Sequence, residues 1–524
     1  SIYSGRTKAW RMLTRSFMAA PSDKNLLAYT PMFHARMFGE TAKYRDKSFQ
    51  PTRTSLAEVH EVGTKFPDTD IFLDGNPTID RPLFVQFCAN EPDELLAAAR
   101  YVAPFCDAVD LNLGCPQGIA RKGKYGAFLQ EDQDLICRLI NKLHVNLAVP
   151  VTAKIRILDT KEKTLEYAKK VLGAGASVLT VHGRQREQKG HNTGLADWSV
   201  IRYLRDNLPK ETVLFANGNI LQREDIDKCL EATGADAVMS AEGNLYDPSI
   251  FSDPPPVGEE GREYWRGKDG KGGYRMDAAL RRYLDIIYKY VLEVPVPERR
   301  RLYVPSDPWP EQWTTESDNE IDGPPKKKQR TALNPGEKKE KATSPNLVAM
   351  QAHLFHLLRP LVAKHHHIRD SLARARAGDI EAFENILQMV EKAVAIGLKE
   401  YVETDGKAIA EDMERDLKLL ESKLEGEANE KAEKDEKDEK YESSLETVRA
   451  CKKPWWVIQA YVRPLPKEAL LKGSMTLSKK EKKKLQGAEK AQTGGSQPSG
   501  HFVPEKVGDG KETVDIPKEG LVCG

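Results

Sequence analysis

Short apolar runs alternate with longer amphipathic stretches over the first half of the chain. The apolar runs are rich in β-branched and aromatic residues and lie at residues 26–29, 83–87, 108–113, 150–157, 177–181, 213–216 and 235–240. The stretches between them repeat apolar residues at helical spacing, at residues 93–102, 132–143, 161–172, 198–206 and 223–232. Strands that alternate with helices in this way predict a parallel sheet with helices packed on it.

The regular alternation favours an α/β fold of the (β/α)8 TIM-type barrel class over an open doubly wound sheet. An open sheet would usually carry a glycine-rich dinucleotide turn after its first strand, and the sequence has no such turn there. The first element is a predicted helix at residues 8–18, with no clear strand in front of it. We therefore expect the first barrel strand to be missing, with residues upstream of Ser1 or a poor substitute in residues 1–7.

The second half of the chain has a different pattern, which begins after Asp253-Pro254-Pro255-Pro256. Apolar residues recur there at helical spacing, and the segments between them are rich in Pro, Lys and Glu. The organisation that we expect is a barrel at 1–250, a helical domain at 270–304 and 347–402, a disordered insert at 305–346, a charged helix or linker at 403–450 and a low-complexity tail at 451–524.

Charge and cysteine content narrow the class of protein. The 524 residues carry 80 Lys and Arg against 79 Asp and Glu, so the net charge of +1 hides local runs such as the basic residues 326–330, a candidate nuclear import signal. The seven cysteines form no close C-x-x-C pair, which favours a reducing compartment. No apolar run approaches the roughly 18 residues that span a bilayer. We expect a soluble protein of the cytoplasm, the nucleus or both.

In a parallel barrel the active site lies at the carboxyl ends of the strands, so the polar residues that close the strands are the candidates for chemistry. Lys154 and Arg156 share one face of their strand, because side chains alternate with a period of two. The strand-closing residues are Gln86, Asn112, Lys154, Arg156, His182, Arg184, Asn217, Gly218, Asn219, Ala241 and Glu242.

One thiol stands at such a strand end. Cys115 comes two residues after the apolar run 108–113. The loop that follows, residues 117–129, is rich in glycine and contains Arg121 and Lys122, so it can bend around a polyanion and offer positive charge to phosphates. The sequence therefore predicts a reactive cysteine next to a phosphate-binding loop.

These residue types suit a flavin phosphate better than a metal ion. A lysine stabilises the negative charge of a reduced flavin ring, and backbone N–H groups at Gly218 and Gly243, each beginning a helix, are expected to hold a phosphate. Metal binding would need converging ligands, and Cys115 with His182 makes a weak case. The consecutive histidines 365–367 point in different directions on a helix. We expect no metal site.

The residue set resembles the tRNA-dihydrouridine synthase family. The resemblance is most specific at residues 111–123, Leu-Asn-Leu-Gly-Cys-Pro-Gln-Gly-Ile-Ala-Arg-Lys-Gly. Residues 29–36, 181–184, 193–198 and 240–245 look like the eukaryotic branch, which acts at positions 16 and 17 of the tRNA D-loop. The resemblance covers residues 8–300 and, more loosely, 347–400 and 454–456, and it supports the barrel interpretation.

The resemblance implies an oxidoreductase with FMN, recharged by NADPH, that reduces uridine to 5,6-dihydrouridine in tRNA. Hydride from the reduced flavin would go to C6 of the uracil, and Cys115, as a neutral thiol, would protonate C5 from the opposite side. The helical domain would grip the tRNA while the target base swings out into the barrel mouth of a monomer. By the same analogy, Gln86, Lys154 and His182 would hold the flavin ring and tail, Asn217, Gly218, Asn219, Ala241 and Glu242 the phosphate and ribitol, and Asn112, Arg121, Lys122, Arg156 and Arg184 the substrate.

Two other functions stay open at this point. The first strand of the family ends in an Ala-Pro-Met type motif, and nothing before Trp10 matches it. One alternative is therefore a tRNA-binding protein with an incomplete, inactive flavin site. The other is a barrel flavoenzyme that acts on a small pyrimidine or dihydropyrimidine.

Overall fold

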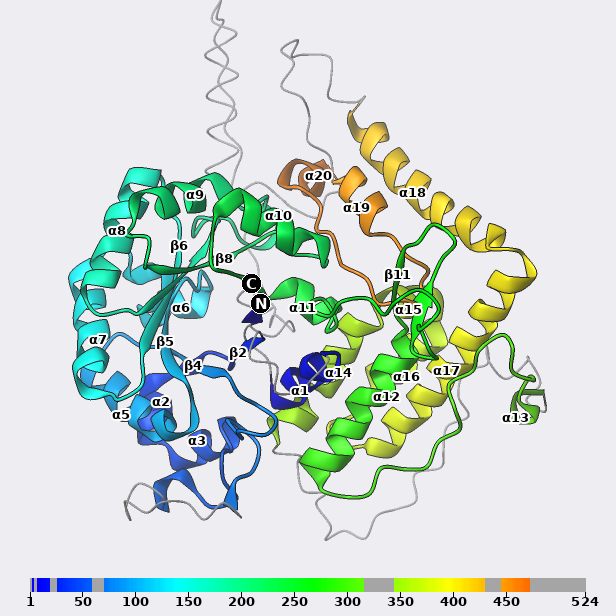
Figure 1. The fold of residues 1–524 in the computed structure, drawn as a ribbon, viewed down its shortest axis with the longest axis horizontal. Coiled ribbons are helices and arrows are strands. Elements are labelled where there is room, and N and C mark those ends of the chain that lie inside the picture. The colour runs from blue at the N-terminus through cyan, green and yellow to red at the C-terminus, as the bar shows by residue number, and fades with distance from the viewer. Residues whose placement is uncertain are drawn as a thin grey trace, which may run out of the picture.

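The computed structural model describes residues 2–3, 7–18, 26–58, 70–314, 344–428 and 444–471. Two bodies stand side by side in Figure 1, a barrel coloured blue to green and a layer of helices coloured green to yellow. The basic runs at 326–330 and 479–484, and most of the insert expected at 305–346, lie outside the described residues.

Eight parallel strands close into a ring. They are β1 (Ile2–Tyr3), β2 (Leu27–Tyr29), β4 (Leu83–Cys88), β5 (Ala108–Leu113), β6 (Val151–Arg156), β7 (Val178–His182), β8 (Val213–Asn217) and β9 (Ala237–Ser240). Neighbours pair in this order, β2 pairs directly with β4, and the short strand β3 (Phe33–His34) adds to the end of β4. The sheet is the barrel that the alternating pattern predicts.

The expectation of a missing first strand is corrected by β1. Ile2 pairs with Leu27 of β2 on one side and with Met239 of β9 on the other, so two residues fill the first position of the barrel. A strand of two residues leaves no alternating pattern in the sequence, which is why the sequence analysis did not recognise it.

Helices cover the outside of the barrel between successive strands. They are α5 (Pro92–Val102), α7 (Gln133–Asn146), α8 (Lys161–Gly173), α9 (Trp198–Asn207) and α10 (Glu224–Thr233), with α2 (Ala35–Glu40) and α3 (Ala42–Ser48) after β3. Four of them begin at side chains that accept backbone N–H groups, namely Glu91, Asp132, Thr160 and Asp197. Their apolar faces and the outer faces of the strands form one core, so the strand ends are held on a rigid frame.

A second core joins the helices that lie beside the barrel. It contains α1 (Lys8–Ser16), α12 (Met276–Ile286), α14 (Pro345–Leu357), α15 (Arg359–Lys364), α16 (His366–Arg374), α17 (Ile380–Glu403) and α18 (Lys407–Ala428). Helix α1 follows the first barrel strand, yet its Trp10 and Leu13 pack in this second core with Tyr283 and Phe383. In Figure 1 it lies next to α14 and α12. The helical layer is therefore built directly onto the barrel.

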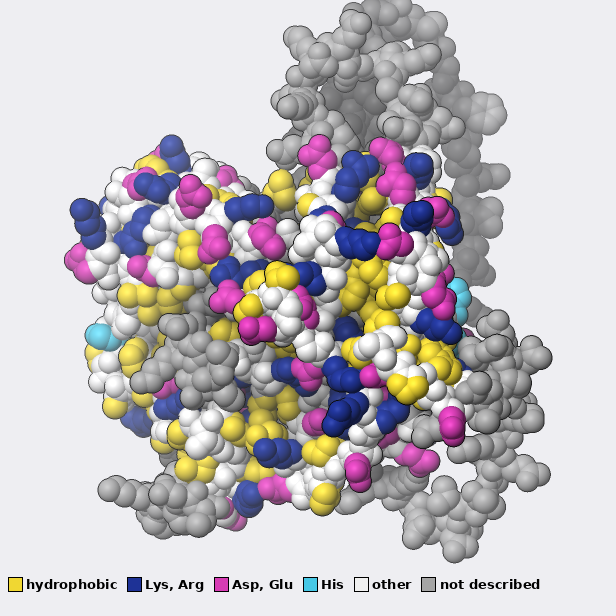
Figure 2. Space-filling model, turned by 45° about the vertical axis from the view of Figure 1, so that its right-hand side comes forward, with side chains coloured by type: hydrophobic (Ala, Val, Ile, Leu, Met, Phe, Trp, Pro, Cys, Tyr) yellow, Lys and Arg dark blue, Asp and Glu magenta, His cyan; other side chains and the backbone are white. Residues whose placement is uncertain are grey.

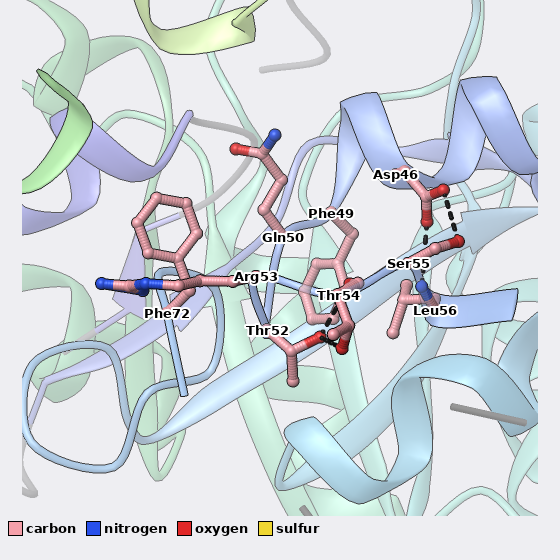
Figure 3. A pocket seen from close by; sticks show the side chains of 9 residues that line it. All are labelled: Asp46, Phe49, Gln50, Thr52, Arg53, Thr54, Ser55, Leu56 and Phe72. Atoms are coloured by element: carbon pink, nitrogen blue, oxygen red, sulfur yellow. Dashed lines mark hydrogen bonds between the residues drawn. The ribbon is translucent and has the colours of Figure 1, made fainter. Parts of the chain in front are cut away.

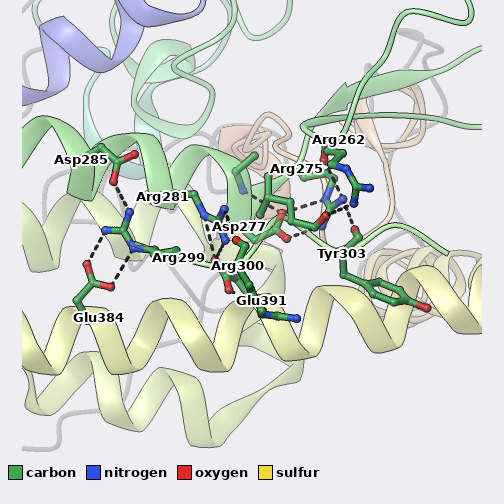
Figure 4. A network of polar contacts seen from close by, with 12 residues as sticks. Arg262, Arg275, Asp277, Arg281, Asp285, Arg299, Arg300, Tyr303, Glu384 and Glu391 are labelled. Atoms are coloured by element: carbon green, nitrogen blue, oxygen red, sulfur yellow. Dashed lines mark hydrogen bonds and ion pairs between the residues drawn. The ribbon is translucent and has the colours of Figure 1, made fainter. Parts of the chain in front are cut away.

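Ion pairs between arginines and carboxylates fasten α12 to its neighbours (Figure 4). Arg275 and Asp277 form a pair with 3% and 1% of their side chains exposed, and Arg275 also donates to the carbonyl of Tyr303. Arg281 of α12 binds Glu391 of α17 at 2.5 Å. Buried charges of this kind are stable only as pairs, so the pair of Arg281 and Glu391 fixes the register between α12 and α17.

The end of the described chain differs from the low-complexity tail expected at 451–524. Trp456, Val457 and Ile458 are buried in the helical core, between α19 (Leu445–Cys451) and α20 (Pro466–Leu471). Trp456 and Trp455 lie against Gly397, where an added Cβ would come within 2.8 Å of both rings. The packing interpretation of this tryptophan pair is confirmed for Trp456.

Candidate active site

The polar residues that close the strands meet at one end of the barrel. Asn112 of β5 lies in register with Lys154 of β6, and Arg156 of β6 lies in register with His182 of β7, which in turn aligns with Asn217 of β8. Each of these side chains is at most 4% exposed. The structure thus brings together most of the residues that the sequence singles out and buries their side chains at the barrel mouth.

A buried carboxylate that the sequence analysis missed organises one side of this row. Asp110 accepts hydrogen bonds from Gln86 (2.8 Å) and from the hydroxyl of Thr152 (2.6 Å), and burial raises the pKa of its carboxyl. The Gln86 oxygen then accepts from Asn112 at 2.9 Å. Asp110 stands two residues before Asn112 in an otherwise apolar strand, and this period of two was the available signal that it faces inward.

Cys115 sits on a turn that Asn112 holds. The side-chain oxygen of Asn112 accepts the backbone N–H groups of Gly114 (3.1 Å) and Cys115 (2.9 Å). In this structure the Asn112 oxygen therefore serves the cysteine turn instead of facing a substrate. The thiol itself is 0% exposed and packs with Cys88, Ala120 and Tyr125. The sequence placed Cys115 correctly at a strand end but gave no sign that the loop would cover it.

The covering loop needs a glycine where it crosses the cysteine. Gly126 has a φ of +64°, and an added Cβ would lie 2.8 Å from the Cys115 carbonyl oxygen and 2.9 Å from its Cβ. The N–H of Ala127 donates to the same carbonyl at 3.1 Å. Any larger residue at position 126 would push the loop off the thiol.

Three cations, one on β6 and two in the loop after β7, hold the cysteine turn and the loop that follows it. Arg156 donates to the carbonyl of Gly114 (2.7 Å) and Lys189 to that of Pro116 (2.7 Å), while Arg186 donates to that of Ala127 (3.2 Å). The expected substrate residue Arg156 is thus a buried support of the cysteine turn. Arg186 and Lys189 belong to the loop after β7, which the sequence analysis did not consider.

A basic cavity opens beside the same loop. It has a volume of about 470 Å³ and is lined by Arg121, Phe128, Glu131, Arg186, Glu187 and Lys189. Arg121 and Lys122 are exposed on the short helix α6 (Gly118–Gly123), and of the two only Arg121 faces this cavity. Arg186 is paired with Glu131 and Glu187, so Arg121 and Lys189 are the cations of the lining that suit a phosphate-bearing ligand.

The opposite side of the mouth contains two buried polar atoms without a partner among the described residues, Nδ1 of His182 and Oδ1 of Asn217. Arg184 donates to Nε2 of His182 at 3.0 Å, so the ring proton lies on Nδ1. Burial and the charges of Arg156, Lys154 and Arg184 lower the pKa of His182 well below its usual value, which keeps the ring neutral. The neighbouring ends of β7 and β8 therefore carry one buried donor and one buried acceptor that a polar cofactor could satisfy.

The loops after β8 and β9 carry the other residues expected at a phosphate. Asn219 accepts from Arg184 at 2.9 Å, while Ala241 is buried. Glu242 begins the short helix α11 (Glu242–Tyr246) and pairs with Arg463 at 2.7 Å. The expectation that Gly218 begins a helix is wrong, because α10 starts only at Glu224, and Gly243 is the second residue of α11.

A smaller cavity of about 260 Å³ lies elsewhere, beside α3 (Figure 3). Its lining includes Asp46, which binds Ser55, and Arg53, which lies over the ring of Phe72 and pairs with Glu293. None of the expected site residues lines it. This cavity is therefore separate from the candidate active site.

The described residues contain neither a metal-binding cluster nor a membrane-spanning helix. No group of three or more His, Cys, Asp and Glu side chains in the described residues is arranged to hold a metal ion. His365 packs on Trp455 with ring centroids 4.5 Å apart. Within the described ranges, no helix combines the length and apolar character needed to cross a bilayer.

Comparison with known proteins agrees with this geometry. Residues 6–266 match the family model described as dihydrouridine synthase (Dus). The tRNA-dihydrouridine(16/17) synthase [NAD(P)(+)] of Saccharomyces cerevisiae is 45% identical over 388 residues, which cover 74% of this chain and 71% of that protein. The protein of the same description from Schizosaccharomyces pombe is 41% identical over 457 residues, which cover 87% and 85%. With its closed parallel barrel and its cysteine at the end of β5, this chain belongs to the dihydrouridine synthase family.

Proposed function

We propose that this chain reduces uridine to 5,6-dihydrouridine in the D-loop of tRNA, at the positions named for its yeast relatives. Membership of the Dus family and the names of these relatives support the reaction. The observation that carries the proposal is the Cys115 turn, held by Asn112 at the end of β5 and next to the polar row of Lys154, His182 and Asn217.

The residues of the mouth fit an FMN cofactor. The unsatisfied atoms of His182 and Asn217 offer a donor and an acceptor, and Lys154 and Arg184 add positive charge. Asp110 and Asn112 already engage the side chain of Gln86, so Gln86 would present only its remaining N–H and lone pair to a flavin edge. When bound, the flavin takes hydride from NADPH and supplies hydride to C6 of the uracil.

Cys115 would provide the proton at C5. A cysteine thiol that is neutral near pH 7 can act as a general acid. Because the thiol is 0% exposed under the loop 117–129, that loop must open before a base can reach the sulfur. The contacts of Arg186 and Lys189 with the carbonyls of Ala127 and Pro116 are the ones that such an opening would break.

The tRNA would be held outside the mouth, since a uracil stacked in a folded RNA cannot enter it. Arg121 and Lys189 beside the 470 Å³ cavity would bind phosphates near the flipped nucleotide. The helical layer would contact the body of the tRNA. On the face shown in Figure 2, Lys and Arg side chains are interspersed with Asp and Glu, so binding there would depend on selected basic positions.

The direct test is an assay with purified protein, FMN, NADPH and an unmodified tRNA transcript, read by mass spectrometry of the nucleosides. The expected result is dihydrouridine in the D-loop, with NADPH oxidation that depends on tRNA. Equal turnover of free uridine would instead indicate a small-pyrimidine reductase. Protein that binds the transcript but takes up no flavin would indicate an RNA-binding protein with an inactive site.

A further inference from the structure

The segment 454–466, called the C-terminal strap below, runs from the helical layer back to the barrel mouth, and it is orange in Figure 1. Its first part is fixed next to the hairpin of β10 (Tyr264–Arg266) and β11 (Gly272–Tyr274). The N–H of Met276 donates to the carbonyl of Trp456 at 2.8 Å, and the N–H of Ile458 donates to that of Tyr274 at 2.9 Å. The strap therefore leaves the helical core in a defined direction.

The middle of the strap rests on aromatic and cationic side chains. The guanidinium of Arg359 lies 3.6 Å from the ring centroid of Tyr461, and the Tyr246 ring is 5.2 Å from Tyr461. Tyr246 belongs to α11, which directly follows the last barrel strand, and Arg359 begins α15. This stack ties the strap to both bodies of the protein.

The far end of the strap is also fixed. Glu468 of α20 accepts from the N–H of Leu465 at 2.8 Å and from the hydroxyl of Ser444 at 2.5 Å. Pro466 lies against Gly194 in the loop after β7. With both ends held, the residues between Tyr461 and Leu465 have a set position over the carboxyl ends of β7 and β9.

The strap places Arg463 over the carboxyl ends of β7 and β9. Its guanidinium binds both carboxylate oxygens of Glu242 at 2.7–2.9 Å, and 44% of the Arg463 side chain is exposed. Arg184 lies close enough for both Glu242 and Arg463 to influence its pKa, which burial lowers to about 10. Arg463 pairs with Glu242, and Arg184 binds Asn219 in the neighbouring loop, so this part of the mouth has two guanidiniums and one carboxylate.

The loops that contain Asn219 and Glu242 lie where TIM-type barrels frequently bind phosphate. In TIM-type barrels the loops after the seventh and eighth strands frequently form such a site. Counted around the ring, these strands are β8, which leads to Asn219, and β9, which leads to Glu242. At these loops the barrel contributes the cation of Arg184, which binds Asn219. Glu242, which begins α11 after β9, is acidic.

We propose that Arg463 binds the phosphate of the flavin together with Arg184, so that the C-terminal strap completes the cofactor site of the barrel. Glu242 holds the guanidinium in place, and the planar fork of arginine suits a phosphate as well as a carboxylate. The inference rests on the proposed flavin chemistry and adds a residue far outside the matched family range of 6–266.

The test compares FMN with riboflavin, which lacks the phosphate, by quenching of flavin fluorescence on titration with flavin-free protein. In the Arg463→Ala variant the dissociation constant of FMN should rise about tenfold or more, as expected when a charged hydrogen-bond partner is lost. The riboflavin constant should not change. Arg463→Lys should restore part of the preference for FMN. Arg449→Ala, an exposed arginine of α19, is the matched control and should leave both constants unchanged.

Each result separates the inference from the function on which it rests. Equal weakening of FMN and riboflavin would show that Arg463 only supports the structure, and unchanged FMN binding would show that it does not reach the phosphate. Either result overturns the inference while flavin binding stands. If the wild-type chain bound neither flavin, the proposed function and the inference would both be contradicted.

Discussion

Burial and three neighbouring cations keep the His182 ring neutral. Its Nε2 accepts from Arg184, so the ring proton lies on Nδ1, and neither this N–H nor the side-chain oxygen of Asn217 has a partner among the described residues. A protonated ring would be repelled by Lys154 and Arg156. The chemistry of this position therefore depends on its surroundings, and a histidine seen in the sequence alone is equally compatible with a structural role.

Because His182 is neutral in the folded protein, the free energy of unfolding should fall as the pH is lowered. Its pKa in the folded protein lies well below the ordinary 6.5, so the unfolded chain takes up the proton first. The stability from the neutral ring is present above about pH 6.5 and is lost below it, by up to about 1.4 kcal/mol per pH unit. Urea unfolding between pH 7 and pH 5 should show a shallower loss for His182→Gln than for wild type.

The control for this prediction is His144→Gln, because His144 is exposed on α7. It should keep the wild-type pH dependence. Identical slopes for wild type and His182→Gln would mean that the ring is not held neutral in the folded state.

The loop 117–129 is the element on which access to Cys115 depends. It is a short helix and a turn, closed by Gly126 and tied to the loop after β7 by Arg186 and Lys189. Polar tethers and the buried side chains of Ala120, Tyr125 and Ala127 hold it, so the free energy of its opening depends on each of these contacts. Cysteine reactivity reports this opening directly.

Replacing Arg186 with Ala should speed alkylation of Cys115 in the native protein about threefold or more, because the hydrogen bond to the Ala127 carbonyl is lost. Labelling with iodoacetamide, followed by peptide mass spectrometry, measures the rate. Arg202→Ala is a suitable control, since Arg202 pairs with Asp206 on the exposed face of α9. A rate that stays at the wild-type level in Arg186→Ala would show that this tether does not hold the loop shut.

The strands and outer helices could be predicted because each has a strong period. The seven apolar runs and five amphipathic stretches correspond to β2, β4 to β9 and α5 and α7 to α10. Strand β1 has only two residues, and its pairing depends on neighbours far away in the sequence. The C-terminal strap is apolar but short, interrupted by proline and without a helical or strand period, so nothing in its sequence placed Trp456 or Arg463. The roles of Asp110 and Arg186 depend on partners in other elements, Thr152 on β6 and Ala127 in the loop after β5.

Helix α1 joins the barrel to the helical layer, so the two bodies share one support. Trp10 packs between Tyr283 and His353, and its indole N–H lies 3.3 Å from the side-chain oxygen of Asn244 in α11. The buried pair of Arg275 and Asp277 fastens the start of α12 below the C-terminal strap. The mouth, the helical layer and the strap should therefore lose structure together.

The Asp277→Ala variant tests this coupling, since it leaves the Arg275 guanidinium buried without its carboxylate. The expected loss is about 3 kcal/mol of unfolding free energy in urea, with weaker FMN binding as the strap is released. Asp285→Ala should cost less than about 1 kcal/mol, because Asp285 is 38% exposed and Arg299 keeps Glu384 as a partner. Equal losses of unfolding free energy in the two variants would show that the buried pair contributes no more to stability than the more exposed pair.

The most direct test of the account is the amount of dihydrouridine that a Cys115→Ala variant forms in a tRNA transcript with FMN and NADPH. The variant should bind FMN and oxidise NADPH like the wild type, because the residues assigned to the flavin, Lys154, His182 and Asn217, lie on other strands, but it should form no dihydrouridine, since C5 would lack its proton donor. Dihydrouridine at the wild-type level in this variant would contradict the role of Cys115 and the mechanism built on it.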